Sequence, residues 1–240
     1  MHTPGTTADP TRTFEGVPVA PRWHTGALVA LYLSVALAGA LLERRGVALR
    51  AASASVGRVM AQYLPLVVVQ WSLALYVARV GRPRSALFAL LGTPWRSLSR
   101  ALADLALAAL AWAFITGVEL ASSRLFASVT PPWVVSVLPH SATERLMWAV
   151  VSVSAGFCEE LVFRGYLQTQ LAAFTGRAWL AVLLQSALFA IAHGEQGEAA
   201  MARAALYGVL FGALARWRRS LAPGIVAHVW TDLASGLLRV

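Results

Sequence analysis

Seven stretches of apolar residues follow one another along the chain, separated by shorter polar segments. Their approximate bounds are 26–42, 59–78, 102–120, 143–171, 178–193, 200–217 and 221–238. About 20 apolar residues are enough for a helix to cross a bilayer, whereas membrane β-strands alternate apolar and polar residues over about 10 positions. The runs do not alternate, and they therefore predict an all-α, polytopic transmembrane helical bundle with about seven spanning helices.

The segments between these runs suggest three parts. Residues 1–25 are polar and rich in proline, and we expect a flexible tail; Asp9 and Glu15 stand where a secretory signal peptide would need basic residues. Residues 26–142 form the N-terminal helices and loops, and residues 143–240 form the last four helices. Pro65 is expected to kink the second span. The apolar segment 86–91 is too short to cross and is expected at the membrane interface, and 121–141 is expected to be a loop.

Composition supports a membrane protein. Hydrophobic residues make up 58% and charged residues 13% of the 240 positions, against roughly 45–50% and about 25% in soluble domains. The net charge is +9, and all 20 basic residues are arginine. The arginines gather between the apolar runs, as residues that orient membrane spans do. The sequence thus indicates contact with a lipid bilayer and no nucleic acid, in a bacterial inner membrane, with the N-terminus in the cytoplasm.

Ionisable residues inside the last apolar helices need an explanation, because each costs at least about 2.5–3.5 kcal/mol at the centre of a bilayer. The fourth predicted helix contains Glu159, Glu160 and Arg164, the fifth ends in His193, and the seventh contains His228 and Asp232. Glu160 and Arg164 are four residues apart and are expected to pair on one helix face. Glu159 is rotated by about 100° from Glu160 and points elsewhere.

These residues are expected to meet. At a rise of about 1.5 Å per residue, Glu159, His193 and His228 fall within one layer of about 12 Å in the middle of the bundle. A glutamate with two imidazoles and an aspartate can activate a water molecule, bind a divalent metal such as zinc, or hold an oxyanion. The other interpretations are a polar network that only locks helices together, and a transporter, which would predict repeats or broken helices that the sequence does not show.

The same residues carry a resemblance to a known family. Glu159-Glu160-Leu-Val-Phe-Arg164 is similar to the EExxxR motif of the CPBP intramembrane proteases, which include the CAAX prenyl endopeptidase and bacteriocin-processing and abortive-infection proteins. Phe189-Ala-Ile-Ala-His193 resembles the FxxxH motif, and His228-Val-Trp-Thr-Asp232 resembles the third motif, HxxxN or HxxxD. The resemblance covers about 146–238. It implies an intramembrane endopeptidase that cuts near the end of a membrane-associated protein or peptide.

The resemblance also implies a role for each residue. Glu159 would activate water, His193 would position it, and His228 with Asp232 would form the oxyanion side of the site. Because an ionised carboxylate cannot donate as an amide does, Asp232 fits a role in orienting His228 or binding metal better. The supporting residues would be Glu160, Arg164 and Phe189. The family resemblance implies either a metal-free glutamate mechanism or one divalent metal, which Glu159, His193 and His228 would bind.

Three further features change little. Cys158, the only cysteine, lies in an apolar run and is expected to be a buried thiol. The GxxxG pattern of Gly208 and Gly212 indicates close packing within the molecule rather than a dimer face. A scaffold or immunity protein of the same family that has lost catalysis is the other interpretation, and the presence of all three motifs weighs against it.

Overall fold

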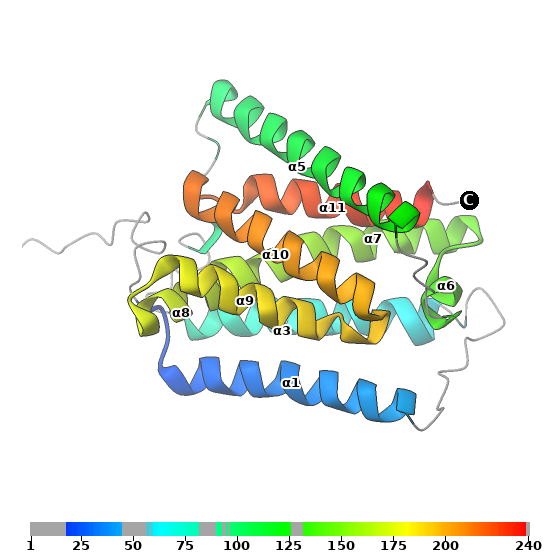
Figure 1. Cartoon of the computed structure of the whole chain (residues 1–240), viewed down its shortest axis with the longest axis horizontal. Coiled ribbons are helices and arrows are strands. Elements are labelled where there is room, and N and C mark those ends of the chain that lie inside the picture. The colour runs from blue at the N-terminus through cyan, green and yellow to red at the C-terminus, as the bar shows by residue number, and fades with distance from the viewer. Residues whose placement is uncertain are drawn as a thin grey trace, which may run out of the picture.

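The computed structural model describes residues 18–44, 57, 59–81, 90–92, 95, 97–125 and 132–238. Long helices dominate this part of the chain, and the predicted all-α bundle is confirmed (Figure 1). They are α1 (Arg22–Arg44), α3 (Leu64–Val80), α5 (Leu98–Leu125), α7 (Ala142–Glu159), α8 (Gln168–Thr175), α9 (Ala178–Ala192), α10 (Glu198–Arg218) and α11 (Ala222–Leu237). Shorter elements are η2 (Val59–Tyr63), α6 (Pro132–Val137), η3 (Glu160–Leu167) and η4 (Gly194–Gln196).

Five of these helical stretches are long and apolar enough to cross a membrane, namely 22–41, 61–80, 98–124, 142–175 and 198–218. The fifth and seventh predicted spans form helices of only 15 and 16 residues, α9 and α11. Both are shorter than the roughly 20 residues of a full crossing. Five of the seven predicted spans thus have full spanning length, and α9 and α11 are shorter helices of the same bundle.

The stretch 142–175 is the central pillar of the bundle. It runs without interruption through α7, η3 and α8, and 56% of its most apolar window is buried, against 11% in α1. Its start is fixed by a capping box, in which the Ser141 hydroxyl accepts from the Glu144 N–H while the Glu144 carboxylate accepts from the Ser141 N–H. This stretch carries both motif glutamates, of which Glu160 is fully buried and Glu159 is partly exposed.

Helices alternate in direction through the bundle (Figure 1). One end of the molecule, the arginine-rich end, gathers the starts of α1, α5, α9 and α11 with the ends of α3, α8 and α10. The arginines at these helix ends and turns are Arg22, Arg79, Arg100, Arg177, Arg216, Arg218 and Arg219. Arg44, Arg124, Arg145 and Arg203 lie toward the opposite end. The other arginines outside the central pillar lie outside the described residues, namely Arg12, Arg45, Arg50, Arg58, Arg82, Arg84, Arg96 and Arg239.

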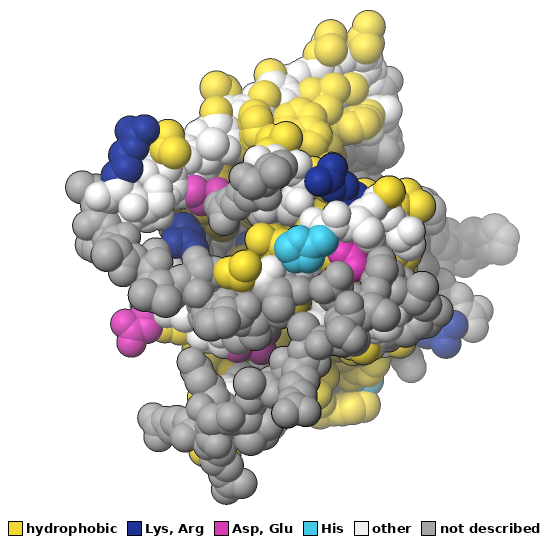
Figure 2. All heavy atoms as spheres, turned by 90° about the vertical axis from the view of Figure 1, so that its right-hand side faces the viewer, with side chains coloured by type: hydrophobic (Ala, Val, Ile, Leu, Met, Phe, Trp, Pro, Cys, Tyr) yellow, Lys and Arg dark blue, Asp and Glu magenta, His cyan; other side chains and the backbone are white. Residues whose placement is uncertain are grey.

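Figure 2 looks onto this opposite end, where charged side chains are scattered and the hydrophobic side chains of α5 stand above the rest of the molecule. Leu102, Leu110 and Phe114 of α5 are 56%, 68% and 48% exposed. Large apolar side chains that face outward along whole helices are what a lipid environment requires, and water disfavours them. The outer helices thus present an apolar surface suited to a bilayer.

Three local expectations are wrong or need refinement. Pro65 lies in the first turn of α3, directly after the π-helical segment η2, so the irregular part of this span is near its start, and the expected kink stays a prediction. A six-residue helix, α6, occupies part of the predicted loop 121–141. In the predicted interface segment, residues 86–89 lie outside the described part, whereas Leu90 is fully buried and the Leu91 carbonyl accepts from the Leu221 N–H at the arginine-rich end.

Asp104, near the start of α5, is buried with 1% of its surface exposed. Its carboxylate accepts from Nε of Arg218 at 2.8 Å and from the indole of Trp95 at 2.9 Å. The ion pair joins the start of α5 to the end of α10, which the sequence alone does not bring together.

Candidate active site

Three helices bring the motif residues together near the middle of the bundle. The central pillar carries Glu159 at the end of α7 and Glu160 at the start of η3, which has π-helical hydrogen bonding. Segments of π-helix are rare and frequently occur at functional sites. Gly156, one turn before Glu159, allows α11 to approach, because a Cβ there would meet the Val229 side chain and lie 3.2 Å from the Ile225 carbonyl. This close approach carries His228 of α11 to the glutamates.

Glu160 links two of the motifs. Its Oε1 lies 2.9 Å from Nη1 of Arg164, the ion pair expected from the four-residue spacing, and 3.0 Å from Nδ1 of His228. The Glu160 and Arg164 side chains are both fully buried. Gly224 leaves room for the carboxylate, since a Cβ there would lie 3.1 Å from Oε2 of Glu160. Glu160 therefore does more than balance Arg164: as an acceptor, it places a proton on Nδ1 of His228.

Arg164 is surrounded by aromatic rings. Its Cζ lies 4.3 Å from the ring centre of Phe189, 5.5 Å from that of Phe211 and 5.8 Å from that of Phe163. Within the described part of the chain, no acceptor is aligned for a hydrogen bond with its side-chain nitrogens. The guanidinium is therefore held by the Glu160 ion pair and by the faces of the rings, which attract a cation.

The other edge of His228 faces two carboxylates. Its Nε2 lies 3.8 Å from Oε2 of Glu159 and 3.7 Å from Oδ2 of Asp232. Both distances exceed hydrogen-bond length, and either gap can be bridged by a small polar molecule. Glu159 and Asp232 keep 23% and 32% of their side-chain surface exposed, while Glu160 has none. The arrangement separates a buried supporting side from an accessible side.

His193 follows the last residue of α9 and is half-buried. Its Nδ1 donates to the Phe189 carbonyl at 2.8 Å, so its Nε2 carries the free lone pair in the neutral ring. The Phe189 ring lies 4.4 Å from the His193 ring and 6.2 Å from the His228 ring, measured between centroids. Glu159 and His228 thus meet directly and His193 joins them through Phe189. The convergence of all three around one small molecule stays a prediction.

A metal does not fit the side chains as the structure places them. Among the described residues, no group of three or more His, Cys, Asp or Glu side chains is arranged so that it could hold a metal ion. The three ligands considered from the sequence, Glu159, His193 and His228, are all within this part. We therefore derive no step through a metal.

Several residues at the site have no sequence motif. Phe211 stacks on His228, with ring centroids 5.7 Å apart and planes inclined by 22°. The Trp148 indole donates to the Asp232 carbonyl at 2.8 Å, and a Cβ at Gly236 would overlap this indole. Tyr32 of α1 packs on Phe163, with centroids 4.9 Å apart. Apolar residues in apolar helices carry no signal of such roles in one sequence, although Phe211 sits inside the GxxxG pattern.

The GxxxG pattern serves packing inside the molecule, as expected. A Cβ at Gly208 would lie 2.8 Å from Cα of Ser186 in α9, and a Cβ at Gly212 would lie 2.7 Å from the side chains of Gln168 and Gln185. Cys158 is a buried free thiol, also as expected, with 1% of its surface exposed.

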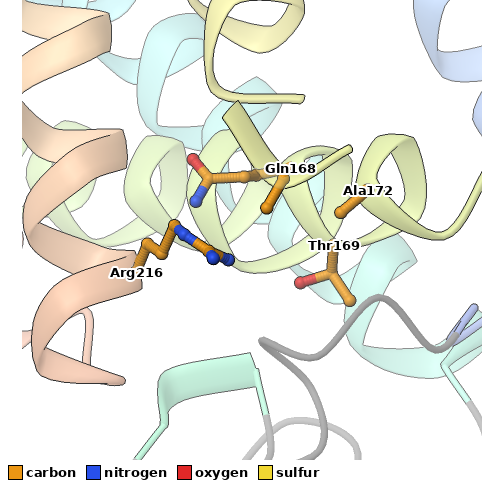
Figure 3. A pocket seen from close by; sticks show the side chains of 5 residues that line it. Gln168, Thr169, Ala172 and Arg216 are labelled. Carbon is orange, nitrogen blue, oxygen red and sulfur yellow. The ribbon is translucent and has the colours of Figure 1, made fainter. Parts of the chain in front are cut away.

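A small cavity of about 10 Å³ lies near the arginine-rich end and has room for about one water molecule. It is lined by Gln168, Thr169, Ala172, Ala178 and Arg216. Figure 3 shows the Arg216 guanidinium pointing from α10 toward Gln168 and Thr169. The cavity contains none of the motif residues, and we assign the candidate active site to the glutamates and histidines instead.

Glu, His and Asp side chains thus lie together between the helices of a bundle that has membrane-spanning helices. Residues 141–234 match the model of the Rce1-like family, described as type II CAAX prenyl endopeptidase Rce1-like. The match confirms the resemblance to the CAAX and CPBP protease family over this segment, which is less than half of the chain. Neither a curated protein nor a solved structure matches. The chain is a multi-pass membrane protein with a CAAX-protease-like segment.

Proposed function

We propose that this protein is an intramembrane endopeptidase that hydrolyses a peptide bond near the end of a membrane-anchored protein or peptide. The observation that carries the proposal is the edge of His228. There Nε2 stands between the accessible carboxylates of Glu159 and Asp232, at 3.8 and 3.7 Å. The buried Glu160 holds the opposite nitrogen. The family match to residues 141–234 supports the same reaction class.

In this mechanism Glu159 is the general base. It takes a proton from a water molecule, and the oxygen attacks the carbonyl carbon of the scissile bond. The free Nε2 of His193 accepts a hydrogen bond that orients this water. When protonated, Nε2 of His228 donates to the oxyanion that forms, and Asp232 beside it stabilises that proton. The proton on Glu159 then passes to the leaving amine, which completes hydrolysis and restores the carboxylate.

The roles of Glu159 and its neighbour differ because their surroundings differ. Glu160 has no exposed surface and already contacts Arg164 and His228, so it cannot reach a substrate without breaking both contacts. The Glu159 side chain is 23% exposed, and its Oε2, which is itself buried and faces His228, has no hydrogen-bond partner among the described residues. A partly exposed carboxylate with one oxygen that no protein group occupies is suited to act as a general base.

The arginine distribution supports the orientation that we propose. The arginine-rich end would face the cytoplasm, which places the N-terminus inside. The membrane would be a bacterial inner membrane, and the substrates would be peptide leaders or C-terminal sorting tails rather than prenylated proteins. Reporter domains fused at the N-terminus and in the α9–α10 turn test the orientation: the first should be active only as a cytoplasmic reporter, and the second only as an external one.

Glu159→Gln tests the mechanism. Gln has nearly the same shape but cannot accept the proton, so cleavage should fall by about 10²–10⁴ while folding is kept. Membrane fractions from cells that make wild type or Glu159→Gln are compared for membrane-anchored proteins cut only by the wild type. One such protein, reconstituted in vesicles with purified enzyme, then gives the rate. Glu198→Gln, at the exposed start of α10, is the matched control and should cleave normally.

Two outcomes would contradict the proposal. Near-wild-type cleavage by Glu159→Gln would remove the base. If no protein in the membrane fraction depended on the wild-type enzyme for cutting, the scaffold or immunity interpretation would gain. A strong chelator distinguishes the metal-free mechanism from a metal-dependent one. The glutamate mechanism predicts an unchanged cleavage rate, whereas loss of cleavage that added zinc restores would show a metal enzyme.

A further inference from the structure

We infer that Phe211 is a positioning residue of the proposed active site, which fixes the plane of the His228 imidazole and holds Arg164 against Glu160. This inference rests on the proposed function for its kinetic consequence, but the geometry of His228 can be measured without any substrate. Phe211 lies on α10, outside the three motifs, and only 2% of its surface is exposed.

Two contacts of one ring carry the inference. The Phe211 ring stacks on His228 at 5.7 Å and 22°, and the same ring lies 5.5 Å from Cζ of Arg164. These are the two groups that share Oε1 of Glu160, at 3.0 and 2.9 Å. Phe211 is thus placed against both partners of the buried carboxylate.

The surroundings explain why a flat ring is needed there. The edge of Phe189 meets the His228 ring at 89°, with centroids 6.2 Å apart, while Phe211 lies nearly parallel to it. A Cβ at Gly224 would lie 3.1 Å from Oε2 of Glu160 and 3.8 Å from Cβ of Phe211, so the pocket has little spare space. A flexible aliphatic side chain would fill similar volume without defining a plane.

Glu160 and Phe211 control different aspects of the position of the His228 imidazole. Glu160 determines which nitrogen points toward the buried side, because only Nδ1 contacts it. Phe211 determines the tilt of the ring, and the tilt decides whether Nε2 points between Glu159 and Asp232. Without the stacked ring, Nε2 would move off that line and the oxyanion contact would weaken.

The test uses Phe211→Leu, which removes the ring face, and Phe211→Tyr, which keeps it. The control is Phe174→Leu, because the Phe174 ring also covers an arginine, Arg22 at 5.6 Å, but belongs to α8 away from the site. With a cleaved substrate in vesicles, we expect Phe211→Leu to lower kcat by about tenfold, the loss of an aromatic contact worth about 1.4 kcal/mol, with KM within about twofold. Phe211→Tyr should recover most of kcat, and Phe174→Leu should match the wild type.

The substrate-free measurement is the nitrogen NMR spectrum of ¹⁵N-histidine-labelled protein in micelles, with the His228 signals assigned by their loss in His228→Gln. Wild type should show one sharp set of His228 nitrogen signals with a proton on Nδ1. Phe211→Leu should shift and broaden this set, because the imidazole loses the stacked ring that fixes its plane. An unchanged His228 spectrum in Phe211→Leu would overturn the inference, even if stability or activity fell. If Glu159→Gln still cleaved, the proposed function would fail while this spectrum would still decide the role of Phe211.

Discussion

Removing Arg164 should strongly destabilise the fold, because it leaves a buried carboxylate without its cation. Arg164 and Glu160 are both fully buried, and Nη1 lies 2.9 Å from Oε1. At that distance and an effective dielectric constant of about 20, their attraction is about 6 kcal/mol, part of which offsets the cost of removing both charges from water. Loss of one partner of a buried pair typically costs about 3–5 kcal/mol.

The substitution Arg164→Ala also removes a cation from three phenyl rings and leaves a cavity between them, which adds to the cost. For a chain of this length, about 3–5 kcal/mol corresponds to a fall in melting temperature of about 6–20 °C. The assay is thermal unfolding of purified protein in detergent, together with the amount that accumulates in membranes. Arg145→Ala, at an exposed position of α7, should leave both unchanged.

A second variant separates the charge effect from the cavity effect. Glu160→Gln combined with Arg164→Ala removes both charges while the Gln oxygen can still accept from Nδ1 of His228. The double variant should therefore be more stable than Arg164→Ala alone. If Arg164→Ala accumulates normally and keeps the wild-type melting temperature, the assignment of this pair to structural support is wrong.

Two further predictions concern packing outside the site. Gly208→Ala should reduce the free energy of unfolding by about 1–3 kcal/mol and lower the melting temperature, because the new Cβ would lie 2.8 Å from Cα of Ser186. Gly117→Ala in α5, where nothing lies within 4 Å of the new Cβ, should be neutral or stabilising by up to about 1 kcal/mol. Equal effects at the two positions would refute the packing argument. Gln170→Leu should release the segment before α1, because the Gln170 amide accepts from the Val19 N–H at 2.7 Å and donates to the Ala20 carbonyl at 2.9 Å, a loss of about 1–3 kcal/mol. Trypsin should then cut after Arg22 faster than in the wild type, and an unchanged rate would contradict this anchoring role.

Local patterns along the chain are enough to predict the helical class and to single out the residues of the candidate site. Apolar runs are a one-dimensional property, and each motif spans at most six consecutive residues. Within such a short stretch, the spacing of Glu160 and Arg164 is enough to predict their pairing. A charged residue inside an apolar run also indicates a candidate site, because burying it without a partner is costly. These signals depend on near neighbours along the chain, and they were readable without coordinates.

The side chains outside the motifs that contact the motif residues can be identified from the tertiary packing alone. Phe211 is one apolar residue among many in α10, and its stacking on His228 depends on how α10 and α11 pack. The pairing of Asp104 with Arg218, more than 100 positions away, is equally invisible in the spacing of charges. The π-helical turn at Glu160 and the contact of this glutamate with His228 likewise arise where helices meet. Contacts between distant segments depend on how complete helix surfaces fit together, and no local pattern in one sequence records that fit.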